Sequence, residues 1–383
     1  MLNSIQMSAS TSKLFQPTQV GDLQLAHRIV FAPATRYRVD DTHTPVPLVA
    51  EYYEQRASVP GSLLISEATL VAQRAGGAKN TPGIWSDAQI SAWKAVTDRV
   101  HAKGSFIYLQ IWALGRAVQA DVLAKESIAC VSASDIPLPG GPTPRPLTVD
   151  EIKEYAELFA QGASNAVHKA GFDGVEIHGA NGYLIDQFLH PGSNVRTDAY
   201  GGSIENRVRF ALEVTEAVVK AVGQQKTAFR ISPWGTWQEM DFDDPMPTYA
   251  HLVTELRDRY PDLAYLHVVE PRADGDQTAS SVKEHHSNDF LREIWGSRPF
   301  ISAGGYTRAS AIAVAEEKGD LVAFARPYIA NPDLPYRLIH DIALTVGNRA
   351  LYYALGSVDP KGYTDYPFVS PVDLLSSKLA KVL

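Results

Sequence analysis

The sequence predicts an α/β protein in which eight parallel strands close into a single (β/α)8 TIM barrel. Short runs rich in β-branched and aromatic residues alternate with longer stretches of helical periodicity, and this alternation is typical of right-handed βαβ units around a parallel sheet. There are eight such runs, which is the number that closes this barrel. An open doubly wound sheet is the alternative, but no G-x-G-x-x-G segment follows any run, so a Rossmann dinucleotide site has no support.

The predicted strands occupy residues 29–35, 63–68, 106–112, 174–178, 227–232, 265–270, 299–304 and 321–325. Helices are predicted between them at residues 87–103, 148–170, 204–222, 247–259 and 308–318. Thr148 and Glu151 form the spacing of a capping box at the start of the second helix. Gly104, Gly171 and Gly319 each follow a predicted helix, where a glycine commonly closes the last turn.

Two long segments interrupt the repeat. Residues 113–147 follow the third strand and carry a glycine pair and a proline cluster, so we expect an insertion that caps the carboxyl-end mouth of the barrel. Residues 269–290 are polar and are expected to form part of the rim. The domain prediction is a flexible N-terminal tail over residues 1–12, one barrel over residues 13–370, and a C-terminal tail over residues 371–383.

Composition excludes several classes of protein. The 383 residues are 45% hydrophobic and 20% charged, as in ordinary globular proteins. The net charge is −8 and no block of lysine and arginine occurs, so neither nucleic acid nor an anionic membrane is an expected partner. Residues 1–12 lack the basic and apolar regions of a secretory signal, which predicts a cytoplasmic location. The single cysteine, Cys130, excludes intrachain disulfides and cysteine-held metal clusters.

Polar and small residues stand at the ends of all eight predicted strands. A barrel gathers these ends around one mouth, where its ligands bind. After the fourth strand come His178 and Asn181, two donors that could hold one electronegative substrate atom, and Tyr183, a phenol that could supply a proton. The other strand ends are Thr35-Arg36, Glu67-Ala68, Gln110 with Trp112, Arg230 with Ser232, Glu270, Ala303-Gly304-Gly305, and Ala325-Arg326.

The last two strand ends predict a phosphate site. Barrels commonly hold a phosphate after strands seven and eight. Gly304 and Gly305 allow backbone amides to approach an anion closely, and Arg326 supplies a forked guanidinium group. A phosphorylated cofactor is therefore favoured at this mouth over a free small substrate.

From residue 15 to residue 367 the chain resembles the old yellow enzyme family of FMN-dependent ene-reductases, which includes oxophytodienoate-reductase-like members. The most specific segment runs from His178 to Arg207 and begins His-Gly-Ala-Asn-Gly-Tyr. Further matching segments are Ala32-Pro33 with Thr35-Arg36, Gln110-Ile-Trp112, Ala330-Asn-Pro-Asp-Leu334 and Gly362-Tyr-Thr-Asp-Tyr-Pro367. The resemblance implies FMN as the cofactor and NADPH or NADH as the hydride donor.

The resemblance also implies the residues that bind FMN. They are Pro33, Ala34, Thr35, Ala68, Gln110, Arg230, Gly304, Gly305, Ala325 and Arg326. Thr35 would hydrogen-bond the flavin O4, Gln110 would bind the pyrimidine edge, and Arg230 would lie beside N1. A cation at N1 stabilises the anionic reduced flavin, which is the electronic tuning that a protein must supply.

By the same resemblance, His178, Asn181 and Tyr183 are the catalytic residues. His178 and Asn181 would bind a carbonyl or nitro oxygen and stabilise an enolate-like transition state. Tyr183 would protonate the α-carbon, because a phenol with a pKa of about 10 stays protonated at neutral pH. Hydride would pass from NAD(P)H to FMN and then, in ping-pong order, to the β-carbon of an α,β-unsaturated carbonyl or nitroalkene. The residues expected to line the substrate side are Trp112, Tyr352 and Phe242.

The chain departs from the family pattern on either side of Arg326. The family usually has a glycine before Arg326 and an aromatic residue after it, whereas this chain has Ala325 and Pro327. Ala325 is expected to weaken one backbone contact to the phosphate, and Pro327 to remove a strand-end amide.

Two alternative functions stay open. A flavin-dependent isomerase or reductase of a secondary-metabolite pathway is one alternative, although Tyr183 favours net reduction. A metal-dependent barrel hydrolase or aldolase is the other, using His178, His267 and Glu270. The enzyme is expected to act on a small molecule as a monomer or homodimer.

Overall fold

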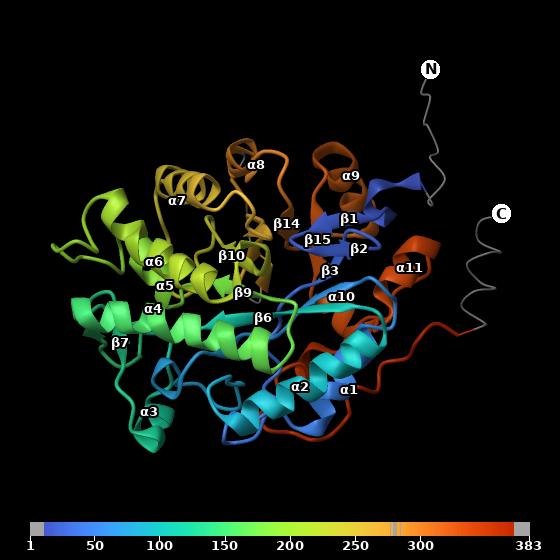
Figure 1. Cartoon of the computed structure of the whole chain (residues 1–383), viewed down its shortest axis with the longest axis horizontal. Coiled ribbons are helices and arrows are strands. Elements are labelled where there is room, and N and C mark those ends of the chain that lie inside the picture. The colour runs from blue at the N-terminus through green and yellow to red at the C-terminus, as the bar shows by residue number, and fades with distance from the viewer. Residues whose placement is uncertain (1–10, 276, 279–281, 284, 371–383) are drawn as a thin grey trace.

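The computed structural model describes residues 11–275, 277–278, 282–283 and 285–370 and shows a closed parallel barrel surrounded by helices (Figure 1). Each strand pairs in parallel with its neighbours, and the ring closes where β4 pairs with β6 and β15 pairs with β3. The predicted (β/α)8 fold and its eight strands are therefore confirmed. The strands are β3 (Ile29–Phe31), β4 (Leu63–Ile65), β6 (Phe106–Trp112), β9 (Gly174–His178), β10 (Thr227–Ile231), β11 (Tyr265–Val269), β14 (Phe300–Ala303) and β15 (Leu321–Phe324), with the short β5 (Thr69–Leu70) beside β6.

The helices form the outer layer of the molecule (Figure 1). Those of the barrel repeat are α1 (Pro47–Arg56), α2 (Asp87–Ala102), α4 (Val149–Ser164), α6 (Ile204–Val222), α7 (Met246–Arg259), α8 (Asp289–Trp295) and α9 (Arg308–Lys318). Shorter ones are α5 (Leu184–Leu189), α10 (Arg326–Ala330) and α11 (Leu334–His340), and 3-10 turns cover Lys13–Phe15, Gln73–Ala75, Gln224–Lys226 and Arg349–Leu351. The prediction missed α8, which has only seven residues, and also α1, whose buried face includes two tyrosines and Arg56, which a search for apolar periodicity does not detect.

The predicted helix ends are found in the structure. At the start of α4, the Thr148 hydroxyl accepts a hydrogen bond from the Glu151 N–H, and the Glu151 carboxylate accepts one from the Thr148 N–H. The helix ends earlier than predicted because it passes into a π-helical turn over Asn165–Lys169. The glycines expected after three helices, Gly104, Gly171 and Gly319, have φ angles of 73°, 79° and 75°, which favour glycine.

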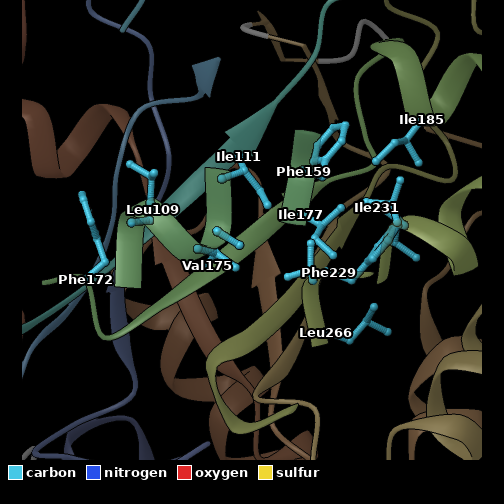
Figure 2. Packing of buried hydrophobic residues seen from close by; sticks show 14 of the residues in the cluster. Leu109, Ile111, Phe159, Phe172, Val175, Ile177, Ile185, Phe229, Ile231 and Leu266 are labelled. Atoms are coloured by element: carbon cyan, nitrogen blue, oxygen red, sulfur yellow. The ribbon is translucent and has the colours of Figure 1, made fainter. Parts of the chain in front are cut away.

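Alternation along the strands separates the core from the barrel interior. Val175 and Ile177 of β9 pack outward into the main hydrophobic core, and Figure 2 shows them in one cluster with Phe159 of α4. Because successive side chains of a strand point to opposite faces, Glu176 and His178 point into the barrel. The same alternation on β6, β10 and β11 sends polar side chains inward, and this places the candidate site.

A hairpin closes the amino-terminal end of the barrel. Its strands, β1 (Thr18–Val20) and β2 (Leu23–Leu25), pair antiparallel. Val20, Leu23 and Leu25 are buried with interior residues of the barrel strands, including Val30 and Leu63, in a second hydrophobic cluster. This end is therefore filled by apolar side chains, and only the carboxyl end is available for a ligand.

The two predicted insertions have short elements of their own. The segment after β6 contains α3 (Ala120–Glu126), β7 (Val131–Ser132) and β8 (Arg145–Pro146), and the segment after β11 contains the hairpin β12 (Ala273–Asp274) and β13 (Gln277–Thr278). Of the predicted tails, residues 1–10 and 371–383 lie outside the described residues. Ser12 is buried and caps the first 3-10 turn. In the described part of the chain, no helix is long and apolar enough to cross a membrane.

Candidate active site

A cavity of about 980 Å³ opens at the carboxyl ends of the strands. Every residue of the predicted site except Phe242 lines it, although these residues come from seven of the eight strand ends and from the segment after α11. They are Pro33, Ala34, Thr35, Ala68, Gln110, Trp112, His178, Asn181, Tyr183, Arg230, Gly304, Gly305, Ala325, Arg326 and Tyr352. The structure thus brings the whole set together, and the roles of its members remain proposals.

His178, the last residue of β9, is a neutral hydrogen-bond donor. Burial, together with the charges of Arg230 and His267, lowers the pKa of His178 well below its ordinary value of 6.5. The Ala180 N–H donates to Nδ1 of His178 at 3.3 Å. Because Nδ1 accepts this bond, the single proton of the neutral ring lies on Nε2, which is left as the donor for a ligand.

Asn181 is held by its backbone. Its φ angle of 58° lies in the left-handed region, which asparagine tolerates better than most residues. Its N–H donates to the Ser232 hydroxyl at 2.8 Å, and its carbonyl accepts a hydrogen bond from Nε2 of Gln238 at 2.9 Å. These contacts use the main chain only, so the side-chain amide of Asn181 is left for a ligand in the cavity that it lines.

Tyr183 stands between two aromatic neighbours. Its ring packs edge-on against Trp112, with centroids 4.7 Å apart, and against His178, with centroids 5.0 Å apart. Burial raises the pKa of Tyr183 above its ordinary value of 10.0. The phenol therefore remains protonated at neutral pH and is able to donate a proton.

Inside the barrel, below this turn, lies a buried polar network that we call the floor: Gln110, Glu176, Arg230 and His267. Nε2 of Gln110 donates to Oε1 of Glu176 at 2.7 Å, and Nδ1 of His267 contacts Oε2 of Glu176 at 2.7 Å. Burial alone would raise the pKa of Glu176, but His267, Arg230 and Gln110 together hold it below its ordinary value. Because one N–H of the Gln110 amide is used by Glu176, its carbonyl oxygen and its second N–H are left for a ligand.

Arg230 supplies the charge that fits an anionic ring edge. It lies on β10 in register with His178 and His267, and its Nε is buried without a hydrogen-bond partner among the described residues. Burying a guanidinium N–H without a hydrogen-bond acceptor destabilises the fold, unless a bound ligand supplies the acceptor. The amide of Gln110 and the guanidinium of Arg230 therefore fit the pyrimidine edge of a flavin, which carries both acceptors and an N–H donor.

The side of the cavity where the phosphate is predicted to bind is built from two turns. Gly304 and Gly305 have φ angles of 132° and 63°, and Nε of Arg272 donates to the Gly304 carbonyl at 2.5 Å. Strand β15 ends at Phe324, and Pro327 lies in the first turn of α10. The backbone N–H that Pro327 lacks is unpaired in any first turn. Pro327, which stands where the family usually has an aromatic residue, therefore lies at a position where proline is tolerated.

Arg36 lines the cavity, but its guanidinium group is engaged in contacts with the C-terminal segment. The Arg36 guanidinium donates to the carbonyls of Tyr352 and Gly362 at 3.0 and 2.7 Å and thereby holds the C-terminal segment against the barrel. Phe242 does not line the cavity, so the expectation that it lines the substrate side is wrong. Its ring packs on His190, with centroids 4.6 Å apart, in the loop that follows β10.

The structure also adds residues that the sequence did not indicate. The rim of the cavity is formed largely by loop residues, which include Tyr37, Gln119, Trp237, Leu344, Tyr353 and Leu355. They lie outside the strands, where no periodicity marks which side chains face inward. The two tryptophans of the segment after β10, Trp234 and Trp237, are the one signal that could have been used.

The three residues of the alternative metal site do not share a cavity wall. His267 contacts Glu176, and Glu270 pairs with Arg292 at 3.2 Å. Only His178 of the three lines the cavity. Within the part of the chain that the structure describes, no group of three or more His, Cys, Asp and Glu side chains is placed to hold a metal ion.

Comparison with known proteins gives a consistent result. Residues 13–345 match the model of the NADH:flavin oxidoreductase / NADH oxidase family. A chanoclavine-I aldehyde reductase of Penicillium roqueforti is 50% identical over 369 residues, covering 93% of this chain and 96% of that protein. An NADP-dependent oxidoreductase of Aspergillus flavus is 47% identical over 376 residues, covering 95% of this chain and 98% of that protein. The crystal structure of old yellow enzyme from a Pichia species has a TM-score of 0.87 at 34% identity, covering 94% and 95%.

Proposed function

The chain belongs to the NADH:flavin oxidoreductase / NADH oxidase family, and from this premise we propose that it reduces the carbon–carbon double bond of α,β-unsaturated aldehydes and ketones. One observation carries the proposal. His178, Asn181 and Tyr183 line one cavity, next to the unpartnered buried Nε of Arg230. Two neutral donors and a protonated phenol suit a substrate with one oxygen to bind and one carbon to protonate.

The residues of the cavity fit FMN. When bound, FMN supplies the hydride, which comes from NADPH or NADH. Gln110 offers a carbonyl oxygen and Arg230 an unpaired donor to the pyrimidine edge, while Thr35 and Ala68 line the wall beside them. Gly304, Gly305 and Arg326 would hold the phosphate, at the ends of the last two strands where barrels commonly bind one.

His178 and Asn181 bind the substrate oxygen in this proposal. Nε2 of His178 and the side-chain amide of Asn181 donate to the carbonyl oxygen, where negative charge develops as the β-carbon accepts hydride. Donors fixed in a buried site stabilise that charge more than water does, because they need no reorganisation during the reaction. A nitro oxygen would be bound in the same way, so nitroalkenes are also expected substrates.

Tyr183 completes the reaction by protonating the α-carbon. Its packing against Trp112 and His178 fixes the phenol beside the pair that binds the oxygen. The proton lost from Tyr183 is replaced from solvent. Because both carbons gain hydrogen, the product is the saturated aldehyde or ketone, and the carbonyl group is retained.

The rim favours a substrate with an apolar body. Trp237, Leu344, Tyr353 and Leu355 line the outer cavity although they are 39%, 38%, 45% and 54% exposed. Apolar side chains at the mouth of a site gain from covering the unreacting part of a ligand. The aldehyde named for the Penicillium roqueforti relative supports an aldehyde as the reacting group.

The absence of a dinucleotide fingerprint implies that NADPH and the alkene use the same cavity in turn, which gives ping-pong kinetics. The Aspergillus flavus relative, described as NADP-dependent, supports NADPH as the donor. We further propose that the enzyme is cytoplasmic and acts as a monomer or homodimer.

The test is anaerobic spectroscopy of the purified protein. It should be yellow with bound FMN, lose its colour with NADPH, and regain it when an enal, enone or nitroalkene is added. The product should be saturated at the former double bond. A colourless protein that binds no FMN, or an allylic alcohol as the product, would contradict the proposal. Isomerised alkene without consumption of NADPH would favour the alternative function.

A further inference from the structure

A loop after β10 packs directly on the turn that carries the proposed catalytic residues. A Cβ atom added to Gly182 would lie 2.8 Å from Cβ of Gln238, 2.9 Å from Cγ of Met240 and 3.2 Å from the Trp237 carbonyl oxygen. Contacts this close leave room only for glycine between Asn181 and Tyr183. The loop therefore covers the peptide units that join these two residues.

Contacts from two distant segments hold the loop in place. The Arg116 guanidinium, from the insertion after β6, donates to the carbonyl of Gln238 at 3.1 Å. From the insertion after β11, Asp274 accepts hydrogen bonds from the N–H groups of Thr236 and Trp237 at 2.8 and 2.7 Å. The position of the loop is thus determined by both insertions of the barrel.

The backbone of the loop is strained at Gln238. Gln238 and its neighbour Glu239 have φ angles of 64° and 58°, in the left-handed region that residues other than glycine rarely adopt. Two such residues in succession persist only when the surrounding contacts impose them, and strain of this kind concentrates at functional sites. Here the imposed conformation brings the Gln238 side chain to the Asn181–Tyr183 turn.

The amide of Gln238 lies against the turn that carries both proposed functional residues. Its Nε2 donates to the Asn181 carbonyl at 2.9 Å, and its proximity to the Tyr183 hydroxyl acts to lower the pKa of that phenol, against the larger opposite effect of burial. Its Oε1 is buried and has no hydrogen-bond partner among the described residues. A buried acceptor without a partner is unfavourable, so the stability of the amide itself does not explain why it lies there.

We infer that Gln238 is a positioning residue for proton transfer from Tyr183, an inference that rests on the proposed function. When Tyr183 gives its proton to the α-carbon, the electron pair of the O–H bond stays on the phenol oxygen as negative charge. A hydrogen bond donated by Gln238 stabilises that charge and orients the hydroxyl toward the substrate. The bond to the Asn181 carbonyl keeps the proton donor in register with the residue that binds the substrate oxygen.

The test replaces Gln238 by methionine, which keeps the length of the side chain and removes the amide. In Gln238→Met, anaerobic bleaching by NADPH and FMN binding should be unchanged, whereas reoxidation by an enal should slow about fivefold to tenfold, the range for one lost hydrogen bond. Glu239→Met is the matched control, since that residue has the same backbone conformation in the same turn. It should leave both half-reactions unchanged.

A double-mutant cycle separates positioning from a structural effect. In the Tyr183→Phe background, Gln238→Met should change the reoxidation rate less than about twofold, because the group on which Gln238 acts is absent. If the two substitutions slow the reaction independently, or if NADPH bleaching slows equally, the inference is wrong. Should Gln238→Met not fold, Gln238→Asn serves instead, because asparagine tolerates the left-handed backbone but is too short to reach Tyr183.

The same data distinguish failure of this inference from failure of the proposed function. If Tyr183→Phe alone leaves alkene reduction intact, Tyr183 is not the proton donor and both proposals fail. If Tyr183→Phe slows reduction but Gln238→Met does not, only the role of Gln238 is refuted.

Discussion

The floor of the cavity and its mouth are built in different ways. Floor side chains come from four neighbouring strands and meet in buried hydrogen bonds of 2.7 Å. At the mouth, which we define as residues 181–183 and 236–238, the functional groups stand on turns with positive φ angles, among them 58° at Asn181 and 64° at Gln238.

The difference lies in what holds each side chain. In the floor, the two-residue period of a strand determines which side chains point inward, and the sheet sets their spacing. In the mouth, the position of the loop that carries Gln238 depends on hydrogen bonds from distant residues such as Arg116 and Asp274. Changes in the floor are therefore expected to alter stability and cofactor binding, and changes in the mouth to alter turnover.

Tyr183→Phe is expected to give the largest effect and tests the mouth. Loss of the phenol hydroxyl removes the proposed proton donor, so the rate of alkene reduction should fall by about 10²–10⁴-fold, as for other general acids. Stopped-flow measurement of reoxidation by an enal gives this rate. FMN binding and bleaching by NADPH should remain as in the wild type. An equal loss of bleaching by NADPH would show that Tyr183 also supports the floor. The floor and the mouth would then not have separate roles in cofactor binding and turnover.

Glu176→Gln tests the floor. The substitution keeps the size of the side chain but leaves Arg230 without its buried counter-charge, so unfolding should become easier by about 3–5 kcal/mol, as when one partner of a buried pair is removed. The reduction potential of the flavin should rise, because the less compensated charge of Arg230 favours the anionic reduced form. Denaturant unfolding and a dye-equilibration titration measure the two effects.

A surface ion pair provides the control for Glu176→Gln. Arg74 and Glu154 lie 2.8 Å apart with side chains 45% and 55% exposed, and Glu154→Gln should cost about 1 kcal/mol or less. Equal losses in the two variants would mean that Glu176 contributes no more than an exposed carboxylate. The floor would then not be the stabilising part of the site.

Gly182→Ala tests how closely the two turns of the mouth are packed. The added methyl group meets both a φ angle of 75° and a contact of 2.8 Å to Gln238, so we expect a loss of about 2–4 kcal/mol in unfolding free energy. Gly202→Ala is the matched control: its φ angle is 79°, with no atom within 4 Å of the new Cβ. It should lose only the backbone part, about 1–2 kcal/mol. Equal losses of unfolding free energy in Gly182→Ala and Gly202→Ala would show that the loop moves away from the added methyl group without loss of stability.

The sequence predicted the strand-borne part of the site better than the loop-borne part. Gln110 and Arg230 were placed at the mouth because they lie on predicted strands whose ends must converge, and the resemblance to the old yellow enzyme family then assigned them to the cofactor. Glu176 was not assigned, although the same alternation places it inside the barrel between Val175 and Ile177. What the sequence could not show is that its carboxylate would be paired with His267, which lies 91 residues further along the chain.

The mouth was predicted only where a family motif marks it. His178, Asn181 and Tyr183 lie within one distinctive segment, whereas Gln238 lies in a polar loop without periodicity. Its left-handed backbone is not marked by glycine or asparagine, because contacts from Arg116 impose it. The hairpin that closes the other end of the barrel was missed for a related reason, since strands of three residues are too short to show alternation.

The smallest expected effect is that of pH on alkene reduction. Burial, with the charges of Arg230 and His267, lowers the pKa of His178 well below 6.5, and burial raises the pKa of Tyr183 above 10.0. Both groups therefore keep one protonation state between about pH 6 and pH 9, and the reoxidation rate should change less than about twofold across this range. In contrast, the free energy of unfolding should fall as the pH drops below 6.5. In this range the imidazole of His178 becomes protonated in the unfolded chain but stays neutral in the folded protein. A titration in the reoxidation rate near pH 6.5 would mean that His178 is solvated in the working enzyme, and the mouth would then have to bind the substrate oxygen with a charged imidazolium.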